Sequence, residues 1–199
     1  TERSAASRFG MTVPTPLPAR VGAKIAPLIG AQPHEVIACD STSVNLFKLI
    51  SAALAMRPGR KVVLSEPGNF PTDLYMADGL LKSLGQGHEL KVVDPEVVAD
   101  HIGEDVAAVM LTHVDYRTGR VHDMKAITEK AHAAGALMIW DLAHSAGALP
   151  VDLGGAGADF AVGCTYKFLN SGPGGPEGRG GGVASFRTPG PGRRPSGNP

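Results

Sequence analysis

Short runs of apolar residues alternate with amphipathic stretches over the first 170 residues of the chain. Unbroken apolar runs are typical of strands that are buried on both faces of a sheet, and they lie at residues 35–39, 61–65, 90–94, 107–112, 137–141 and 159–164. Apolar positions at helical spacing between these runs predict helices over residues 17–29, 44–56, 72–84, 95–102 and 123–134. The alternation favours an α/β domain in which helices cover both faces of a mostly parallel sheet.

The last 29 residues, 171–199, break this pattern. They hold ten glycines and six prolines, and their few apolar residues cannot bury enough surface to offset the entropy of ordering. We therefore divide the chain into one domain over residues 1–170 and a disordered tail over residues 171–199.

The overall composition excludes several classes of protein. The chain has 199 residues with 19 basic and 19 acidic side chains, a balance that argues against nucleic-acid binding. No apolar run approaches the roughly 18 residues of a membrane span, and the chain begins without an apolar leader. Its two cysteines, Cys39 and Cys164, form no disulfide or metal-binding pattern. We expect a cytoplasmic protein, present here as a fragment.

Two segments at predicted strand ends carry hydroxyl and acidic side chains where a helix begins. Asp40–Ser43 follows the first strand, and Phe70–Asp73 follows the second. Hydroxyls and free backbone N–H groups at a helix start can bind an anion such as a phosphate. A plain helix cap explains each segment equally well when the segment is considered alone.

Two further strand ends carry titratable side chains. Asp141 ends one strand and His144 follows it, a spacing that suits a metal-ligand pair, a helix cap or a contact with a heterocyclic ligand. No further metal ligand stands nearby in the sequence, so we expect no metal. Lys167 follows the last strand between Tyr166 and Phe168. Apolar neighbours disfavour the charged form of a lysine, which suits Schiff-base chemistry.

Together these features suit one cofactor, pyridoxal phosphate. Its phosphate needs the start of a helix, and its ring needs an aromatic side chain to stack on. Its pyridine nitrogen needs a carboxylate, and its aldehyde needs an amine. Candidates for all four stand at strand-to-helix junctions, and a parallel sheet brings such junctions together at one edge.

Several motifs of the chain resemble those of bacterial kynureninases, which are pyridoxal-phosphate enzymes of the aspartate-aminotransferase-like fold. The resemblance extends in order from about Leu17 to Gly174, and its last two motifs together are the most specific. The matching segments are Asp40–Phe47, Phe70–Asp73, Thr112–Gly119, Trp140–Gly147 and Cys164–Asn170.

The resemblance implies a reaction and three catalytic residues. The reaction is the hydrolysis of L-kynurenine to anthranilate and L-alanine, with 3-hydroxykynurenine as the second candidate substrate. Lys167 would form the Schiff base and remove the α-proton, and Asp141 would keep the pyridine nitrogen protonated. Tyr166 would reach the phosphate and assist proton transfer. The family acts as a homodimer, and we expect the same assembly here.

The same resemblance implies which residues hold the cofactor. Thr42 and Ser43 would bind its phosphate, Phe70 would stack on its ring, and Asp73 and His144 would hydrogen-bond around it. The whole implied cofactor-binding set is Thr42, Ser43, Phe70, Pro71, Thr72, Asp73, Asp141, His144, Tyr166 and Lys167.

The chain departs from the kynureninase pattern after about residue 174. Relatives continue there into an apolar strand and a small domain, which supplies an arginine for the substrate carboxylate. This chain instead becomes rich in glycine, proline and arginine, as a shifted reading frame would produce. We therefore expect an incomplete kynureninase with little activity. A non-catalytic cofactor-binding remnant and another enzyme of the same fold, such as a cysteine desulfurase, are the alternatives.

Overall fold

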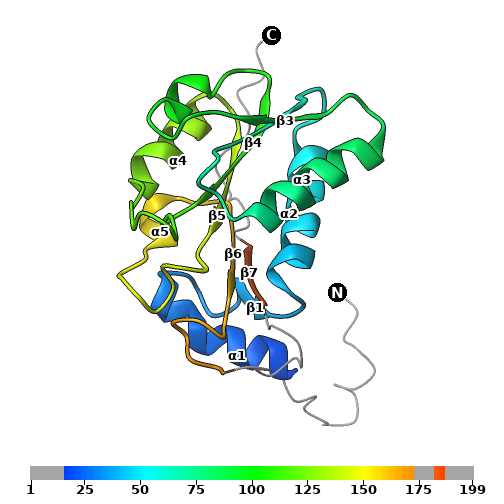
Figure 1. The fold of residues 1–199 in the computed structure, drawn as a ribbon. Coiled ribbons are helices and arrows are strands. Elements are labelled where there is room, and N and C mark those ends of the chain that lie inside the picture. Colours follow the sequence, from blue (N-terminus) through cyan, green and yellow to red (C-terminus); the bar gives the residue numbers. More distant parts are fainter. Residues whose placement is uncertain (1–15, 173–181, 187–199) are drawn as a thin grey trace, which may run out of the picture.

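The computed structural model describes residues 16–172 and the backbone of residues 182–186. Its centre is a seven-stranded sheet with the order β1-β7-β6-β5-β4-β2-β3 (Figure 1). Neighbouring strands from β3 to β6 pair in parallel, whereas β7 is antiparallel to both of its neighbours. The strands are β1 (Val36–Ala38), β2 (Val62–Ser65), β3 (Glu89–Val92), β4 (Val106–Thr112), β5 (Leu137–Asp141), β6 (Phe160–Cys164) and β7 (Gly182–Phe186).

Helices cover both faces of this sheet (Figure 1). One face packs against α1, α4, α5 and the two 3-10 helices η2 and η3, and the other face packs against α2 and α3. The helices are α1 (Leu17–Ile25), η2 (Ala26–Ile29), α2 (Thr42–Met56), α3 (Pro71–Leu84), η3 (Val98–His101), α4 (Met124–Ala133) and α5 (Leu153–Ala156). None of the helices in the described ranges is long and apolar enough to cross a bilayer. The layering confirms the predicted α/β fold class.

The double cover explains why the central strands are unbroken apolar runs. Every residue of β4, β5 and β6 is buried. Successive residues of β5 enter opposite cores, since Trp140 packs on the α4 side and Ile139 on the side of α2 and α3. Burying one large apolar side chain stabilises a fold by roughly 1.5–3 kcal/mol. The close approach of α1 to β1 also needs Gly22, because an added Cβ would lie 2.0 Å from the carbonyl oxygen of Val36.

Strand β7 lies within residues 171–199, the stretch whose composition predicts a disordered tail. Its residues pair with β6 on one side and with β1 on the other. That expectation was based on the scarcity of apolar side chains. A strand inside a sheet is also stabilised by backbone hydrogen bonds to two neighbouring strands, which do not depend on apolar side chains. The other residues of the expected tail, apart from Ser171 and Gly172, lie outside the described part of the chain.

Candidate functional site

A cavity of about 230 Å³ opens at the carboxyl edge of the sheet, where the segments that follow β1, β2, β5 and β6 meet. This edge is where α/β folds bind their ligands. The volume is several times the roughly 30 Å³ share of a water molecule, so the cavity has room for a small organic ligand. Its lining residues are Ser41, Thr42, Ser43, Phe70, Thr72, Asp73, Asp141, Ala143, Cys164, Tyr166 and Lys167.

The start of α2 forms one wall of the cavity. Ser41 caps the helix, since its hydroxyl oxygen accepts a hydrogen bond from the amide of Val44 at 3.3 Å. Thr42 donates its hydroxyl proton to the carbonyl oxygen of Gly163 at 3.0 Å, which ties the helix start to β6. An anion at this wall therefore meets the first amide groups of the helix and the hydroxyl of Ser43, an arrangement that suits a phosphate.

Lys167 lies among aromatic and imidazole rings. Its Nζ atom is 5.4 Å from the ring centre of Phe70, 5.8 Å from that of Tyr166 and 2.8 Å from Nε2 of His144. An ammonium group can only donate, so Nε2 accepts this hydrogen bond and the imidazole is neutral. Burial first, and then the charge of Lys167, lower the pKa of His144, while Asp115 opposes the shift. The imidazole proton then lies on Nδ1, a buried atom without a hydrogen-bond partner among the described residues.

Two buried carboxyl groups line the cavity, Asp73 at the start of α3 and Asp141 at the end of β5. Oδ1 of Asp141 accepts a hydrogen bond from the amide of Ala143 at 2.9 Å, whereas Oδ2 of Asp73 has no partner within the described ranges. Burial raises the pKa of Asp141 to about 6, against the opposing effects of that amide and of Lys167. Burial and the neighbouring Asp141 raise the pKa of Asp73 to about 8, again opposed by Lys167. Near neutral pH the pair therefore retains a proton, and a cationic N–H group beside it would favour full ionisation.

Tyr166 and Cys164 line the cavity next to Lys167. Burial first, and then the interactions with Cys164, raise the pKa of Tyr166, so the phenol keeps its proton. Burial also raises the pKa of the Cys164 thiol, although Lys167 opposes this shift. A phenol can donate a hydrogen bond to a phosphate oxygen, whereas a buried, protonated thiol is a weak nucleophile.

Tyr116 belongs to the same group of rings, and its role was not predicted from the sequence. Its ring stacks on His144 with the ring centres 5.8 Å apart, and it meets Phe70 edge-on at 5.5 Å. The available signal was its place in the Thr112–Gly119 motif, which begins at the end of β4 and therefore at the same edge of the sheet.

Eight of the ten residues expected to hold a cofactor line this cavity, and two, Pro71 and His144, do not. Pro71 occupies the first position of α3, where its fixed backbone angle starts the helix. His144 contacts the site through its hydrogen bond with Lys167.

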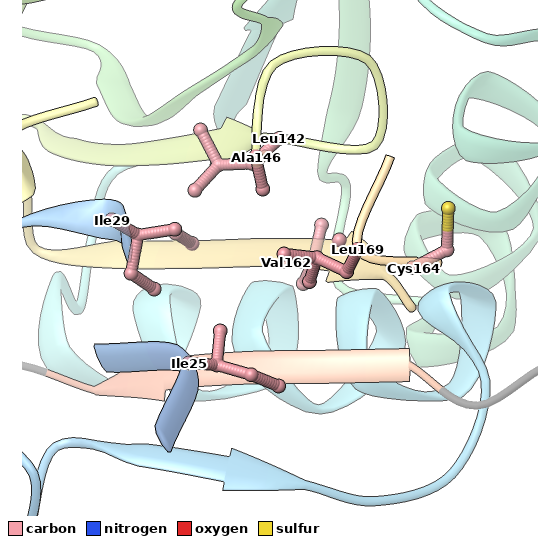
Figure 2. Close-up of a pocket in the computed structure, with 9 residues that line it drawn as sticks. Ile25, Ile29, Leu142, Ala146, Val162, Cys164 and Leu169 are labelled. Atoms are coloured by element: carbon pink, nitrogen blue, oxygen red, sulfur yellow. The ribbon is translucent and has the colours of Figure 1, made fainter. Parts of the chain in front are cut away.

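A second, apolar pocket lies between α1, η2 and β6 (Figure 2). Its volume of about 10 Å³ is close to the least space that can hold one water molecule. Most of its labelled side chains are aliphatic, among them Ile25, Ile29 and Leu169. This pocket is a packing gap beside the strand that leads to Lys167, and it offers no polar group to a ligand.

Comparison with characterised sequences identifies the relatives of the chain. Residues 17–180 match the model of the aminotransferase class-V family. The chain is 58% identical over 160 residues to the kynureninase of Pseudomonas fluorescens, covering 78% of this chain and 38% of that protein. The kynureninase of Deinococcus radiodurans is 60% identical over 160 residues, which cover 80% of this chain and 38% of that protein. The kynureninase of Burkholderia mallei is 54% identical over 165 residues, which cover 80% of this chain and 40% of that protein. The chain thus spans about two fifths of the length of these relatives.

Solved structures share the fold at much lower sequence identity. A NifS-like protein superposes with a TM-score of 0.70 at 16% identity, over 85% of this chain and 47% of that protein. The apo structure of a cysteine desulfurase from Thermococcus onnurineus NA1 superposes with a TM-score of 0.65 at 24% identity, over 85% of this chain and 42% of that protein. Identities this low establish the fold alone.

Pyridoxal phosphate is the cofactor that the family and the kynureninase relatives imply, and the cavity fits it. Oδ2 of Asp73 and Nδ1 of His144 are buried polar atoms that no described residue pairs, and the carboxyl pair suits a protonated pyridine nitrogen. The start of α2 suits the phosphate, and Lys167 supplies the amine that an aldehyde needs. Because the family match extends over residues 17–180 and both the fold and the cavity agree with it, the chain belongs to the aminotransferase class-V family.

Proposed function

We propose that this chain is the cofactor-binding part of a kynureninase, which hydrolyses L-kynurenine to anthranilate and L-alanine. The proposal depends above all on the cluster of Lys167, neutral His144 and the buried Asp73–Asp141 pair at one cavity. An identity of 54–60% to kynureninases over about 80% of the chain supports this choice among the enzymes of the fold. The 3-hydroxy form of kynurenine is the second candidate substrate.

Each residue of the cluster has a task in this proposal. Pyridoxal phosphate, when bound, supplies an electron sink for carbanion chemistry. Lys167 binds the aldehyde and then removes the α-proton of the substrate, while His144 orients Nζ of Lys167 through the 2.8 Å hydrogen bond. Asp141 holds a proton on the pyridine nitrogen and Asp73 hydrogen-bonds beside it. Phe70 stacks on the ring.

The helix start and the phenol act at the other end of the cofactor. Ser43 and the first amide groups of α2 bind the phosphate, with Thr42 holding the helix start against β6. Tyr166, whose pKa burial raises, donates a hydrogen bond to the phosphate and assists proton transfer. Water adds to the γ-carbonyl of the substrate and the Cβ–Cγ bond breaks. The aryl group and the γ-carbon become anthranilate, and the α-amino group remains in L-alanine.

We extend the proposal to a homodimer in the cytoplasm. Phe70, Tyr166 and Phe168 beside the cavity are 39–48% exposed, and a second copy of the chain is a suitable cover for such aromatic side chains. Both cysteines are thiols, as is usual in a reducing compartment.

A cysteine desulfurase has less support. That chemistry needs an activated thiolate, whereas burial raises the pKa of Cys164 and the thiol of Cys39 is hydrogen-bonded to Oδ1 of Asn45 at 3.5 Å. The thiol of Cys164 is therefore buried and keeps its proton, whereas a reactive cysteine is exposed and ionised.

The proposal is tested by mixing the pyridoxal-phosphate-loaded chain with L-kynurenine and, separately, with L-cysteine. L-Kynurenine is expected to change the absorbance of the bound cofactor and to give slow anthranilate fluorescence, and Lys167→Ala is expected to abolish both signals. Sulfide released from L-cysteine would indicate a desulfurase instead. Cofactor binding with no response to either amino acid would indicate the non-catalytic remnant and refute a kynureninase.

A further inference from the structure

We propose that Glu66 is a positioning residue for the cofactor cavity, because its buried carboxylate joins the segment that carries Phe70 to the segment that carries Tyr116. The inference rests on the proposed role of the cavity in binding pyridoxal phosphate. Neither Glu66 nor its partners line the cavity, so the action of Glu66 is indirect.

The carboxylate of Glu66 is fully buried directly after β2 and makes two charge-assisted hydrogen bonds. Oε2 accepts one from Nη2 of Arg120 at 2.6 Å, and Oε1 accepts one from Nε2 of His122 at 2.8 Å. A carboxylate can only accept, so the imidazole presents its Nε2 proton to Glu66. Arg120 and His122 therefore satisfy both oxygens of one buried group, as such a charge requires.

Glu66 begins a segment, residues 66–70, in which Pro67 and Asn69 also make hydrogen bonds to residues outside it. Nη2 of Arg117 donates to the carbonyl oxygen of Pro67 at 3.2 Å. The side-chain Nδ2 of Asn69 donates to Oγ of Ser65 at 3.2 Å. A Cβ on Gly68 would lie 3.0 Å from a carboxylate oxygen of Asp115, so a larger residue there would require the Asp115 side chain to shift.

The partners of Glu66 belong to the segment 113–122, which follows β4. Within it, Tyr116 stacks on His144 and contacts Phe70. Its two ends are also joined, because the amide of His122 donates to the carbonyl oxygen of His113 at 3.1 Å. The amide of His113 in turn donates to the carbonyl oxygen of Asp141 at 2.9 Å.

One carboxylate therefore connects the segments that position a stacking ring, a second ring and the backbone of Asp141. A buried ion pair contributes little net stability compared with well-packed apolar residues, so stability alone does not account for a charge at this place. The fixed geometry of the two segments does account for it, since small displacements of positioning groups cost binding and rate.

The test compares Glu66→Gln with a matched control, Asp159→Asn. Asp159 also accepts from a histidine, Nε2 of His132 at 2.7 Å, and from the amide of Met138 at 2.8 Å. It precedes β6 and so lies at the opposite edge of the sheet from the cavity. Both changes replace a carboxylate that accepts from a histidine by its neutral amide, but only Glu66→Gln affects the segments at the cavity.

Two readouts separate positioning from general stability. The first is the dissociation constant of pyridoxal phosphate by absorbance titration, which Glu66→Gln is expected to raise roughly tenfold and Asp159→Asn by less than about twofold. The second is hydrogen exchange of the cofactor-free chain, which Glu66→Gln is expected to speed in segments 66–70 and 113–122. Asp159→Asn is expected to speed exchange near Met138 instead.

The outcomes are distinct. Equal effects of the two variants on cofactor affinity, with unchanged exchange in both segments, would overturn the positioning role. If the parent chain does not bind pyridoxal phosphate, the proposed function fails, and hydrogen exchange still decides whether Glu66 couples the two segments. If Glu66→Gln does not fold, Arg120→Lys, which keeps the charge but not the forked donor, is expected to give the same selective pattern.

Discussion

Replacing Asp73 by asparagine is expected to stabilise the cofactor-free chain at neutral pH and to weaken its binding of pyridoxal phosphate. The carboxyl is 2% exposed, lines the cavity together with Asp141, and has an oxygen that no described residue pairs. An asparagine has nearly the same shape and never becomes charged. The change therefore removes the electrostatic cost of burying a carboxylate beside Asp141, and it also removes the group that the cofactor would use.

The magnitude follows from the pKa of Asp73, which burial and Asp141 raise to about 8 from an ordinary value of 3.8. The folded chain then holds this proton more tightly than the unfolded chain, so the free energy of unfolding falls as the pH rises between about 4 and 8. The slope is about 1.4 kcal/mol per pH unit, and by about pH 7 the loss reaches about 4 kcal/mol. Domains of this kind have a total stability of roughly 5–15 kcal/mol, so the gain in Asp73→Asn is measurable.

Urea unfolding of the cofactor-free chain at about pH 5 and about pH 8 measures the effect. Trp140 reports it, because it is the single tryptophan of the chain and is fully buried in β5. Asp73→Asn is expected to exceed the parent in stability, and by more at the higher pH. Asp78→Asn removes an exposed carboxylate of the same helix, which pairs with Lys82, and is expected to follow the parent at both pH values. A stability difference between Asp73→Asn and the parent that is zero, or independent of pH, would refute the reasoning.

Three further changes test other parts of the structure. Asp141→Asn is expected to keep the chain folded in urea titrations but to weaken pyridoxal-phosphate binding, because an amide cannot stabilise a protonated pyridine nitrogen; unchanged affinity would remove Asp141 from this role. Gly22→Ala is expected to cost about 3 kcal/mol or more in thermal unfolding, since its methyl group would lie 2.0 Å from the carbonyl oxygen of Val36, and a neutral effect would contradict the close packing of α1 on β1. Cys164 is expected to react with iodoacetamide more slowly in the folded than in the urea-unfolded chain, because burial raises its pKa; mass spectrometry that finds equal rates would argue against this burial.

The layers of the fold could be predicted from the sequence because strands that are buried on both faces appear in it as unbroken apolar runs. The run 107–112 is apolar at nearly every position, and β4 is buried throughout. Strand β7 shows no such apolar run, because its place between β1 and β6 depends on backbone pairing, which cannot be inferred from side-chain composition. The four-residue helix α5 likewise has too few residues for a helical period to show.

The chemistry of the site was predictable in its parts but not in its couplings. Lys167 and Asp141 stand at strand ends, so their meeting at one edge follows from a parallel sheet. The effect of Asp141 on the pKa of Asp73, and of burial on both carboxyl groups, depends on distances in three dimensions that spacing along the chain does not contain. The contact of Tyr116 with His144 and the burial of Glu66 are tertiary facts of the same kind.

The proposed chemistry of the cavity depends most directly on Lys167 as the residue that binds pyridoxal phosphate. Borohydride reduction of the chain incubated with pyridoxal phosphate, followed by peptide mass mapping, locates the attached cofactor. The added mass is expected on Lys167, and Lys167→Ala is expected to lose it while remaining folded. An added mass on Lys48 or Lys61, with Lys167 unmodified, would contradict the role of Lys167 in binding the cofactor.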